Sequence, residues 1–348
     1  MSEAPTQTPP APKPKKKKKA PDFGRQFLVS AAPHLRVGLS TRRIMFEVVG
    51  AMTPMFVVAL YAFRLQALLI TVAVVVACLL TEAIANRMRG RGQESLADGS
   101  AIVTGVILAF SLPPGLHLYM AFIGGVVAIA LAKAIFGGLG QNLFNPAMVG
   151  RAFLMICFPA AMGAWLEPQT LARIGDASID GVTMATPLAA AIDPALSPPP
   201  LSALFFGGVG GSIGETSALA ALLGGLYLVI RGVADWRQPL GVLLAASVFA
   251  FAATAGGFGD RLEGVAFHLC SGAMMFGAFF IATDYVGSPI TPIGRLIFGF
   301  GVGVLVMIIR LYGAYPEGFM FAILIMNSLT PLIERWTRPT PFGGHVAT

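Results

Sequence analysis

Apolar residues run through this chain in long, nearly uninterrupted blocks that short polar segments separate. An α-helix needs about 20 apolar residues to cross a bilayer, and most of the blocks approach that length. Alternation with a period of two residues, which marks the strands of a membrane barrel, is absent. The pattern predicts about ten membrane-spanning helices, at residues 44–63, 65–85, 100–112, 116–136, 146–161, 214–233, 239–255, 265–283, 293–311 and 318–332.

The composition supports this interpretation. Of the 348 residues, 55% are hydrophobic and only 12% are charged, whereas soluble domains carry about 25% charged residues. So little polar surface does not cover a globule in water. We therefore predict an all-α polytopic membrane protein, and its 41 glycines suit membrane helices whose backbones approach closely.

Polar segments divide the chain into a leader, two membrane regions, a loop region and a tail. The leader carries Lys13 and a run of five further lysines but no apolar core of a signal peptide. This composition favours a disordered cytoplasmic segment at an anionic membrane surface over binding to nucleic acid. In order, the five predicted regions are residues 1–25, 26–161, 162–211, 212–338 and 339–348.

The arginines between the spans are unevenly distributed. With both termini in the cytoplasm, that side receives most of them, among them Arg43, Arg87, Arg231 and Arg295. Because cytoplasmic loops carry an excess of Lys and Arg, we predict this orientation, which places the loop region 162–211 on the opposite side.

The sequence also contains a faint internal repeat. Arg64-Leu-Gln-Ala-Leu before the second span resembles Trp236-Arg-Gln-Pro-Leu before the seventh, and Ser100 and Ser271 begin similar stretches at a similar offset. Five spans in each half would make the halves two inverted five-helix repeats, as in many transporters. Chance similarity among Leu-, Ala- and Gly-rich helices explains the pattern equally well.

The cysteines and histidines predict no metal or iron–sulfur site. Cys78, Cys157 and Cys270 all lie in apolar runs and form no C-x-x-C pair. They are best interpreted as small core residues. One histidine in an apolar run, His268, makes a haem improbable because haem ligation favours facing histidines.

Two segments on the outer side combine helix-start signals with polar side chains. Thr186 precedes Pro187, which is typical of an N-cap and a first helical residue. Ser212-x-x-Glu215 matches a capping box at the start of the sixth span. Both signals are sufficient as structural explanations. A helix N-terminus also favours a phosphate, so an anion-binding role stays open.

Two breaks interrupt the apolar pattern on the inner side. Residues 137–146 are rich in glycine and carry Asn142 and Asn145, two amides suited to a neutral heterocycle. Residues 284–292 begin with Asp284, for which a solvated loop position or an ion pair with Arg295 is at least as good an explanation as an ion site.

Lys133 and Glu82 are ionisable residues within apolar spans. Such residues are costly in lipid. Both lie near the inner ends of their spans, so we expect their side chains to extend to the membrane surface rather than to form an ion path.

Two long motifs give the chain a specific resemblance. They are Phe136-Gly-Gly-Leu-Gly-Gln-Asn-Leu-Phe-Asn-Pro-Ala-Met-Val-Gly-Arg-Ala-Phe153 and Gly211-Ser-Ile-Gly-Glu-Thr-Ser-Ala-Leu219, with shorter matches at Pro33-His34-Leu-Arg36, Asp98-Gly-Ser-Ala and Ala282-Thr-Asp284. Together they resemble the RnfD subunit family, whose sister is NqrB. The resemblance covers about residues 30–335 and leaves the lysine-rich leader outside.

The resemblance implies an electron-transfer subunit of a membrane complex that exchanges electrons between ferredoxin and NAD while moving Na⁺ or H⁺. In that family a threonine carries FMN through a phosphoester, after an Asp and a Ser/Thr-Gly-Ala-Thr pattern. Here the acceptor is Thr186, and Met184 replaces the usual glycine. The FMN-binding residues so implied are Asp180, Gly181, Thr183 and Ala185, and we add Gly214, Glu215 and Thr216 from the second outer helix start.

The resemblance further implies a noncovalent riboflavin, which we assign to Asn142 and Asn145, with an ion or structural role for Asp284 and Lys133. It implies partner subunits that carry a second flavin and iron–sulfur clusters, and a flavin transferase that attaches the FMN. The expected location is the bacterial inner membrane, with the Thr186 loop on the periplasmic side. The alternatives are a plain secondary transporter or channel, and a scaffold for neighbouring subunits.

Overall fold

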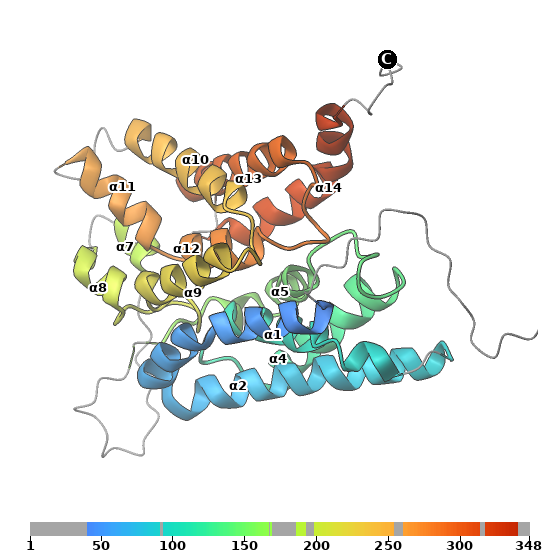
Figure 1. Ribbon diagram of the computed structural model, residues 1–348. Coiled ribbons are helices and arrows are strands. Elements are labelled where there is room, and N and C mark those ends of the chain that lie inside the picture. Colours follow the sequence, from blue (N-terminus) through green and yellow to red (C-terminus); the bar gives the residue numbers. More distant parts are fainter. Residues whose placement is uncertain are drawn as a thin grey trace, which may run out of the picture. The chain divides into compact units, whose positions relative to one another are not determined.

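The computed structural model describes residues 40–90, 93–166, 168, 186–192, 198–253, 260–313 and 317–339. All of these residues belong to the larger of two units into which contacts divide the chain, Leu39–Thr348. The regular elements in these ranges are all helices (Figure 1), as the sequence predicts. The predicted leader and most of the predicted tail lie outside the described residues.

The first helices form a hairpin. Helix α1 (Thr41–Ala51) is followed almost directly by α2 (Thr53–Met88), and the chain reverses within α2 at Arg64 (Figure 1). Arg64 has φ 54° and ψ −132°, and it is the one non-glycine residue with positive φ in the described part of the chain. The predicted turn between the first two spans is therefore confirmed.

Three shorter helices complete the first membrane region, after the 3₁₀ turn η1 (Gln93–Leu96). These are α3 (Ser100–Phe110), α4 (Leu118–Ile129), which continues into the π-helical turn η2 (Ala130–Ala134), and α5 (Pro146–Cys157), followed by the short α6 (Pro159–Met162). Asn145 begins α5 because its side chain accepts from the backbone N–H groups of Ala147 and Met148.

The second part of the chain begins with two six-residue helices, α7 (Pro187–Ile192) and α8 (Leu201–Phe206). The longer helices are α9 (Ala218–Ile230), α10 (Arg237–Ala253), α11 (Arg261–Cys270), α13 (Pro292–Tyr312) and α14 (Phe319–Thr337). Between α11 and α13 lie the short α12 (Met274–Phe276) and the π-helical turn η4 (Gly277–Ile281).

The helices of each half pack in the same order. In the first half, α2 packs on α3 and α4, and α4 packs on α5; in the second, α10 packs on α11 and α13, and α13 packs on α14. Contacts of α1 with α9 and of α5 with α14 join the halves. Glycines allow the closest approach: a Cβ at Gly299 of α13 would lie 2.3 Å from the Gln238 carbonyl oxygen of α10.

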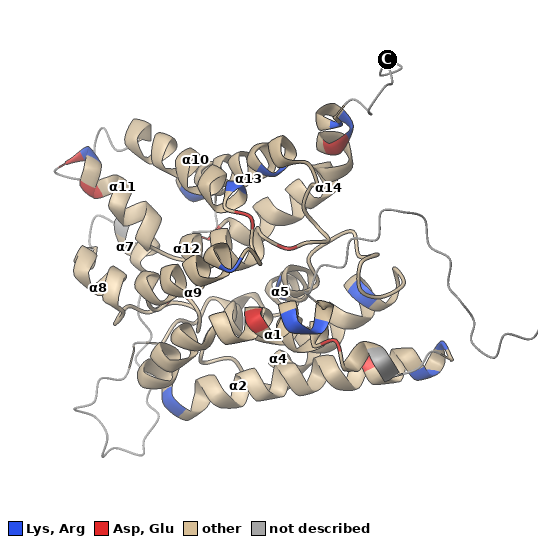
Figure 2. Cartoon of the chain, viewed as in Figure 1, with Lys and Arg blue, Asp and Glu red and all other residues tan. Residues whose placement is uncertain are grey.

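Length and apolarity identify a membrane protein. Two helical stretches among the described residues are long and apolar enough to cross a membrane, Thr41–Met88 and Pro292–Tyr312. The pair Arg261–Cys270 and Met274–Ile281, bent by 64°, would make a third. Several other apolar helices are shorter, at 10–17 residues. Figure 2 shows that charged residues are sparse along the helices.

Two local predictions are wrong. The capping box at Ser212 does not start a helix, because α9 begins at Ala218 and its N-cap is Ser217, whose hydroxyl accepts from the Ala220 N–H at 3.3 Å. Lys133 and Glu82 do not extend to a membrane surface, since Lys133 is 2% and Glu82 5% exposed. Their ammonium and carboxylate groups instead pair inside the protein, at 2.7 Å.

Candidate functional site

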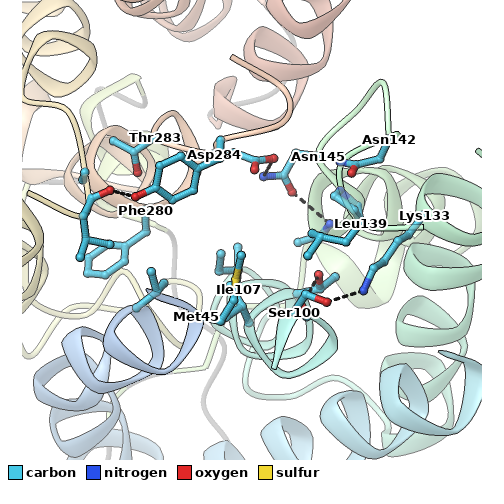
Figure 3. A pocket seen from close by; sticks show the side chains of 18 of the residues that line it. Met45, Ser100, Ile107, Lys133, Leu139, Asn142, Asn145, Phe280, Thr283 and Asp284 are labelled. Carbon is cyan, nitrogen blue, oxygen red and sulfur yellow. Dashed lines mark hydrogen bonds between the residues drawn. The ribbon is translucent and has the colours of Figure 1, made fainter. Parts of the chain in front are cut away.

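The two predicted breaks face one cavity. The volume of the cavity together with its open mouth is about 760 Å³. The break after η2 contributes Asn142 and Asn145, and the break after η4 contributes Asp284 (Figure 3). Lys133 lies on the same cavity. The structure thus brings together the four inner residues singled out in the sequence, and Met45, Ile107, Leu228 and Phe280 add apolar walls.

Asn145 joins the two breaks. Its Oδ1 caps α5, at 3.0 Å from the Ala147 nitrogen and 3.3 Å from the Met148 nitrogen, and its Nδ2 donates to Asp284 Oδ2 at 3.3 Å. Asn142 donates to the Phe144 carbonyl oxygen at 3.1 Å. Both side chains are buried. The amide groups therefore fix the glycine-rich break while lining the cavity.

Asp284 is half-buried and accepts from the Val286 N–H at 3.3 Å. The ion pair with Arg295 that was an alternative for it does not form. Arg295 instead donates to Asp235 Oδ2 at 2.6 Å and to the Pro289 carbonyl oxygen at 3.1 Å. Asp284 is therefore a carboxylate that faces the cavity, with an amide as its side-chain partner.

Lys133 carries a buried positive charge at the cavity. The π-helical turn η2 places its Nζ 2.7 Å from Glu82 Oε1 and 2.6 Å from Ser100 Oγ, at the first residue of α3 (Figure 3). Ser95 also donates to the same oxygen of Glu82, at 3.1 Å. Three elements distant in the sequence are thus tied together by one ammonium group.

Thr186 is the N-cap of α7, as its position before Pro187 predicts. Its Oγ1 accepts from the Ala189 N–H at 3.1 Å, and its side chain is only 3% exposed. Four of the residues assigned to FMN binding, Asp180, Gly181, Thr183 and Ala185, lie outside the described residues.

The turn that contains Gly214, Glu215 and Thr216 is buried against α3. The Gly214 N–H donates to the Phe110 carbonyl oxygen at 2.7 Å, and a Cβ at Gly214 would lie 2.8 Å from Phe110 Cβ. Thr216 donates to the Ile213 carbonyl oxygen at 3.3 Å. The glycine is needed here because the turn touches α3.

Glu215 belongs to a buried ionic cluster, which we define as Arg151, Glu215, Arg310 and Glu317. Arg151 of α5 lies 3.8 Å from Glu215 and 2.5 Å from Glu317. Arg310, near the end of α13, donates to the carbonyl oxygens of His268 and Ser271 at 2.8 and 2.9 Å. All four side chains are less than 8% exposed.

The ionic cluster reaches the helix that Thr186 begins. A Cβ at Gly272, which has φ +60°, would lie 3.0 Å from both Arg310 Nη2 and Leu188 Cδ1, and 3.5 Å from Glu317 Oε1. Leu188 is the second residue of α7. The structure therefore places Thr186, Glu215 and the break between α11 and α12 in one neighbourhood.

A family model described as NQR2, RnfD, RnfE matches residues 28–343. The chain belongs to this family. A relative from Clostridium ljungdahlii, named as part of a proton-translocating ferredoxin:NAD(+) oxidoreductase complex, is 40% identical over 91% of this chain and 96% of its own length. The counterpart in a Na(+)-translocating complex of Acetobacterium woodii is 43% identical over 90% and 95%. A relative from an ion-translocating oxidoreductase complex of Halorhodospira halophila is 40% identical over 90% and 94%.

The resemblance to the RnfD family is thus confirmed. The sequence did not single out Arg310 and Glu317 as partners in a site. The available signal was weak: each is a charged residue at the end of a long apolar stretch, where a surface position is the ordinary explanation. Only the packing of α5 against α14 brings Arg151 to Glu317.

Proposed function

We propose that this chain is the membrane electron-transfer subunit of an ion-translocating ferredoxin:NAD oxidoreductase complex. The cavity that joins the two inner breaks is the observation that carries the proposal, because it gives an apolar helix bundle a polar internal site lined by residues from both halves. The printed names of three relatives, each about 40% identical, describe such complexes. The chain acts with other subunits, including a second flavin subunit and iron–sulfur subunits.

The proposal includes ten spans in two inverted five-helix repeats. The matching packing order of the two halves supports it. So do two buried cations in corresponding places. Lys133, at the end of the α4–η2 helix, bonds Ser100, and Arg310, at the end of α13, bonds the carbonyl oxygen of Ser271. These are the two serines that the sequence repeat aligns.

For the cavity we propose a noncovalent riboflavin. The cavity combines apolar walls with a few polar groups, as cofactor sites usually do. Asn142 and Asn145 would hold polar edges of the ring, and Lys133 supplies a positive charge at one side. A bound flavin supplies one- or two-electron transfer, which protein groups tune.

For Thr186 we propose the covalent FMN. Polar atoms of the neighbouring ionic cluster and breaks are buried without a hydrogen-bond partner, among them Arg151 Nε, Arg310 Nε, Ser212 Oγ and Ser271 Oγ. Such donors fit an anionic group better than an apolar one. Gly214, Glu215 and Thr216 belong to the same proposed environment, because Arg151 links Glu215 to Glu317.

The proposal also covers maturation and location. An unactivated hydroxyl does not attack a phosphoanhydride unaided, so a flavin transferase is needed. The excess of arginine at one set of loops supports cytoplasmic termini and a periplasmic Thr186, in a bacterial inner membrane. Asp284 and Lys133 are the charged residues that we assign to an ion or structural role.

Flavin fluorescence tests the proposal. The full chain, co-expressed with a flavin transferase, is separated in a denaturing gel, where only covalent flavin stays with the protein. We expect a fluorescent band in the wild type and none in Thr186→Val. Noncovalent riboflavin is measured in the supernatant after acid denaturation. Protein with neither flavin, in vesicles that take up solute without redox partners, would instead support a plain transporter.

A further inference from the structure

A groove between α1 and α9 lies apart from the sites described above. The volume of the groove together with its open mouth is about 1,030 Å³. Phe46, Pro54 and Leu223 line its sides, and Phe46 and Leu223 are about half exposed. Gly50 and Gly224 line it as well. The groove is therefore an apolar trough on the face of two helices that an apolar environment must cover.

Where α1 and α9 meet, the two helix backbones form the floor of the trough. A Cβ at Gly224 would lie 2.1 Å from the Ala51 carbonyl oxygen, so α1 and α9 touch there without side chains between them. A Cβ at Gly50, in contrast, would meet nothing within 4 Å. Gly50 thus borders open space in the trough.

Two guanidinium groups lie side by side at one end of this trough. Arg43 Nε and Arg231 Nη2 both bond Glu47 Oε1, at 3.1 and 2.9 Å. The carboxylate is 13% exposed, whereas the arginine side chains are 55% and 44% exposed. Glu47 Oε1 therefore holds two guanidinium groups close together, and each of them keeps N–H donors that can bind a further anion.

The position of the arginines is that of a membrane boundary. Arg43 lies in the first turn of α1, and Arg231 directly follows the last residue of the apolar helix α9. Arg42, stacked 5.8 Å from the centre of the Phe46 ring, adds a third cation. With one carboxylate against three guanidinium groups, this end of the groove is positively charged, and its continuation is apolar.

We propose that the groove is a binding site for an anionic phospholipid. The phosphate bridges Arg43 and Arg231, and an acyl chain lies along Phe46, Gly50, Pro54 and Leu223. The charge pattern argues for this occupant, because a molecule with one anionic end and one apolar chain matches both ends of the groove. Basic pockets between membrane helices bind anionic headgroups in the same way, and guanidinium groups favour phosphate.

Lipid-dependent stabilisation of the full-length chain in nonionic detergent tests the site. The probes are phosphatidylglycerol and phosphatidylcholine with identical acyl chains, and inorganic phosphate as the headgroup without a chain. We expect phosphatidylglycerol to raise the unfolding temperature and to stay bound in native mass spectra. Phosphatidylcholine should need at least about tenfold higher concentration for the same effect, because its choline cation cancels the phosphate charge and would lie near three guanidinium groups.

Three variants separate a built site from general surface charge. Arg43→Gln/Glu47→Gln/Arg231→Gln removes the headgroup contacts without leaving Glu47 unpaired. Gly50→Leu fills the trough from a position where a Cβ meets nothing within 4 Å. Both should lose the preference for phosphatidylglycerol. Arg87→Gln/Arg89→Gln, which removes two exposed arginines away from the groove, should keep it.

Several results would overturn the proposal. These are equal stabilisation by both lipids, full retention of the preference in Gly50→Leu, or an equal loss in Arg87→Gln/Arg89→Gln. An effect of inorganic phosphate as large as that of the lipid would also overturn it, because the trough would then contribute nothing. If the triple variant does not fold, Gly50→Leu still decides the outcome. None of these measurements depends on flavin.

Discussion

The buried pair of Lys133 and Glu82 allows a quantitative test of the inner site. In Lys133→Met the ammonium group is lost, while the side chain keeps its length and apolar character. Among the described residues, Glu82 then keeps only the Ser95 hydroxyl as a side-chain donor, at a side-chain exposure of 6%. Removing one partner of a buried pair costs about 3–5 kcal/mol, mostly because a charge stays buried without compensation. We expect Lys133→Met to lose stability on that scale.

The double variant Glu82→Gln/Lys133→Met isolates the cause. It leaves no buried charge at this position, so it should be markedly more stable than Lys133→Met alone, with a coupling energy of at least about 2 kcal/mol in the double-mutant cycle. Reaction of Cys78 with a thiol dye during heating follows unfolding, because this thiol is fully buried between α2 and Gly125 of α4. A Cys157→Ser/Cys270→Ser background removes the exposed thiol and the partly exposed one. Equal stability of the single and double variants would refute the reasoning.

Three further changes test other contacts. Gly299→Ala should lower stability by about 1–3 kcal/mol, since the new methyl group meets the Gln238 carbonyl oxygen at 2.3 Å; Gly50→Ala is the control for the thermal measurement. Asn145→Asp keeps the cap of α5 but sets a carboxylate against Asp284, so noncovalent flavin should be lost; unchanged flavin content would contradict the assignment. Leu188→Ala should loosen α7 and speed FMN attachment in a timed transferase assay, and an unchanged rate would contradict this.

The hydrophobic pattern predicted the helical architecture because apolar blocks and their breaks are local properties. The turn at Arg64 was visible as one charged residue between two apolar blocks, and the cap at Thr186 as Thr-Pro. The inner breaks were visible as clusters of glycine, proline and amides, and they do line one cavity. In each case the signal lies within a few residues of the structure that it specifies.

Contacts between distant segments could not be predicted in this way. Lys133 and Glu82 are 51 residues apart, and two ionisable residues near span ends are ordinarily explained by access to the surface. The Arg151–Glu317 pair spans 166 residues and depends on how α5 crosses α14. The sequence shows which charges are present, but only the packing of the halves decides which of them meet.

Thr186 illustrates how a local signal and a chemical role can coexist. A six-residue helix such as α7 is too short to be stable alone, so its contacts hold it in place. Leu188 provides them by packing with Leu204, Val209 and Phe267 in a small apolar cluster separate from the main core. Such satellite regions open at lower free energy than the core. The hydroxyl of Thr186 is buried and accepts from the Ala189 N–H, so a transferase does not reach it while α7 stays packed. Attachment of FMN to this residue would therefore require α7 to move away from its apolar cluster while the main helix bundle stays folded.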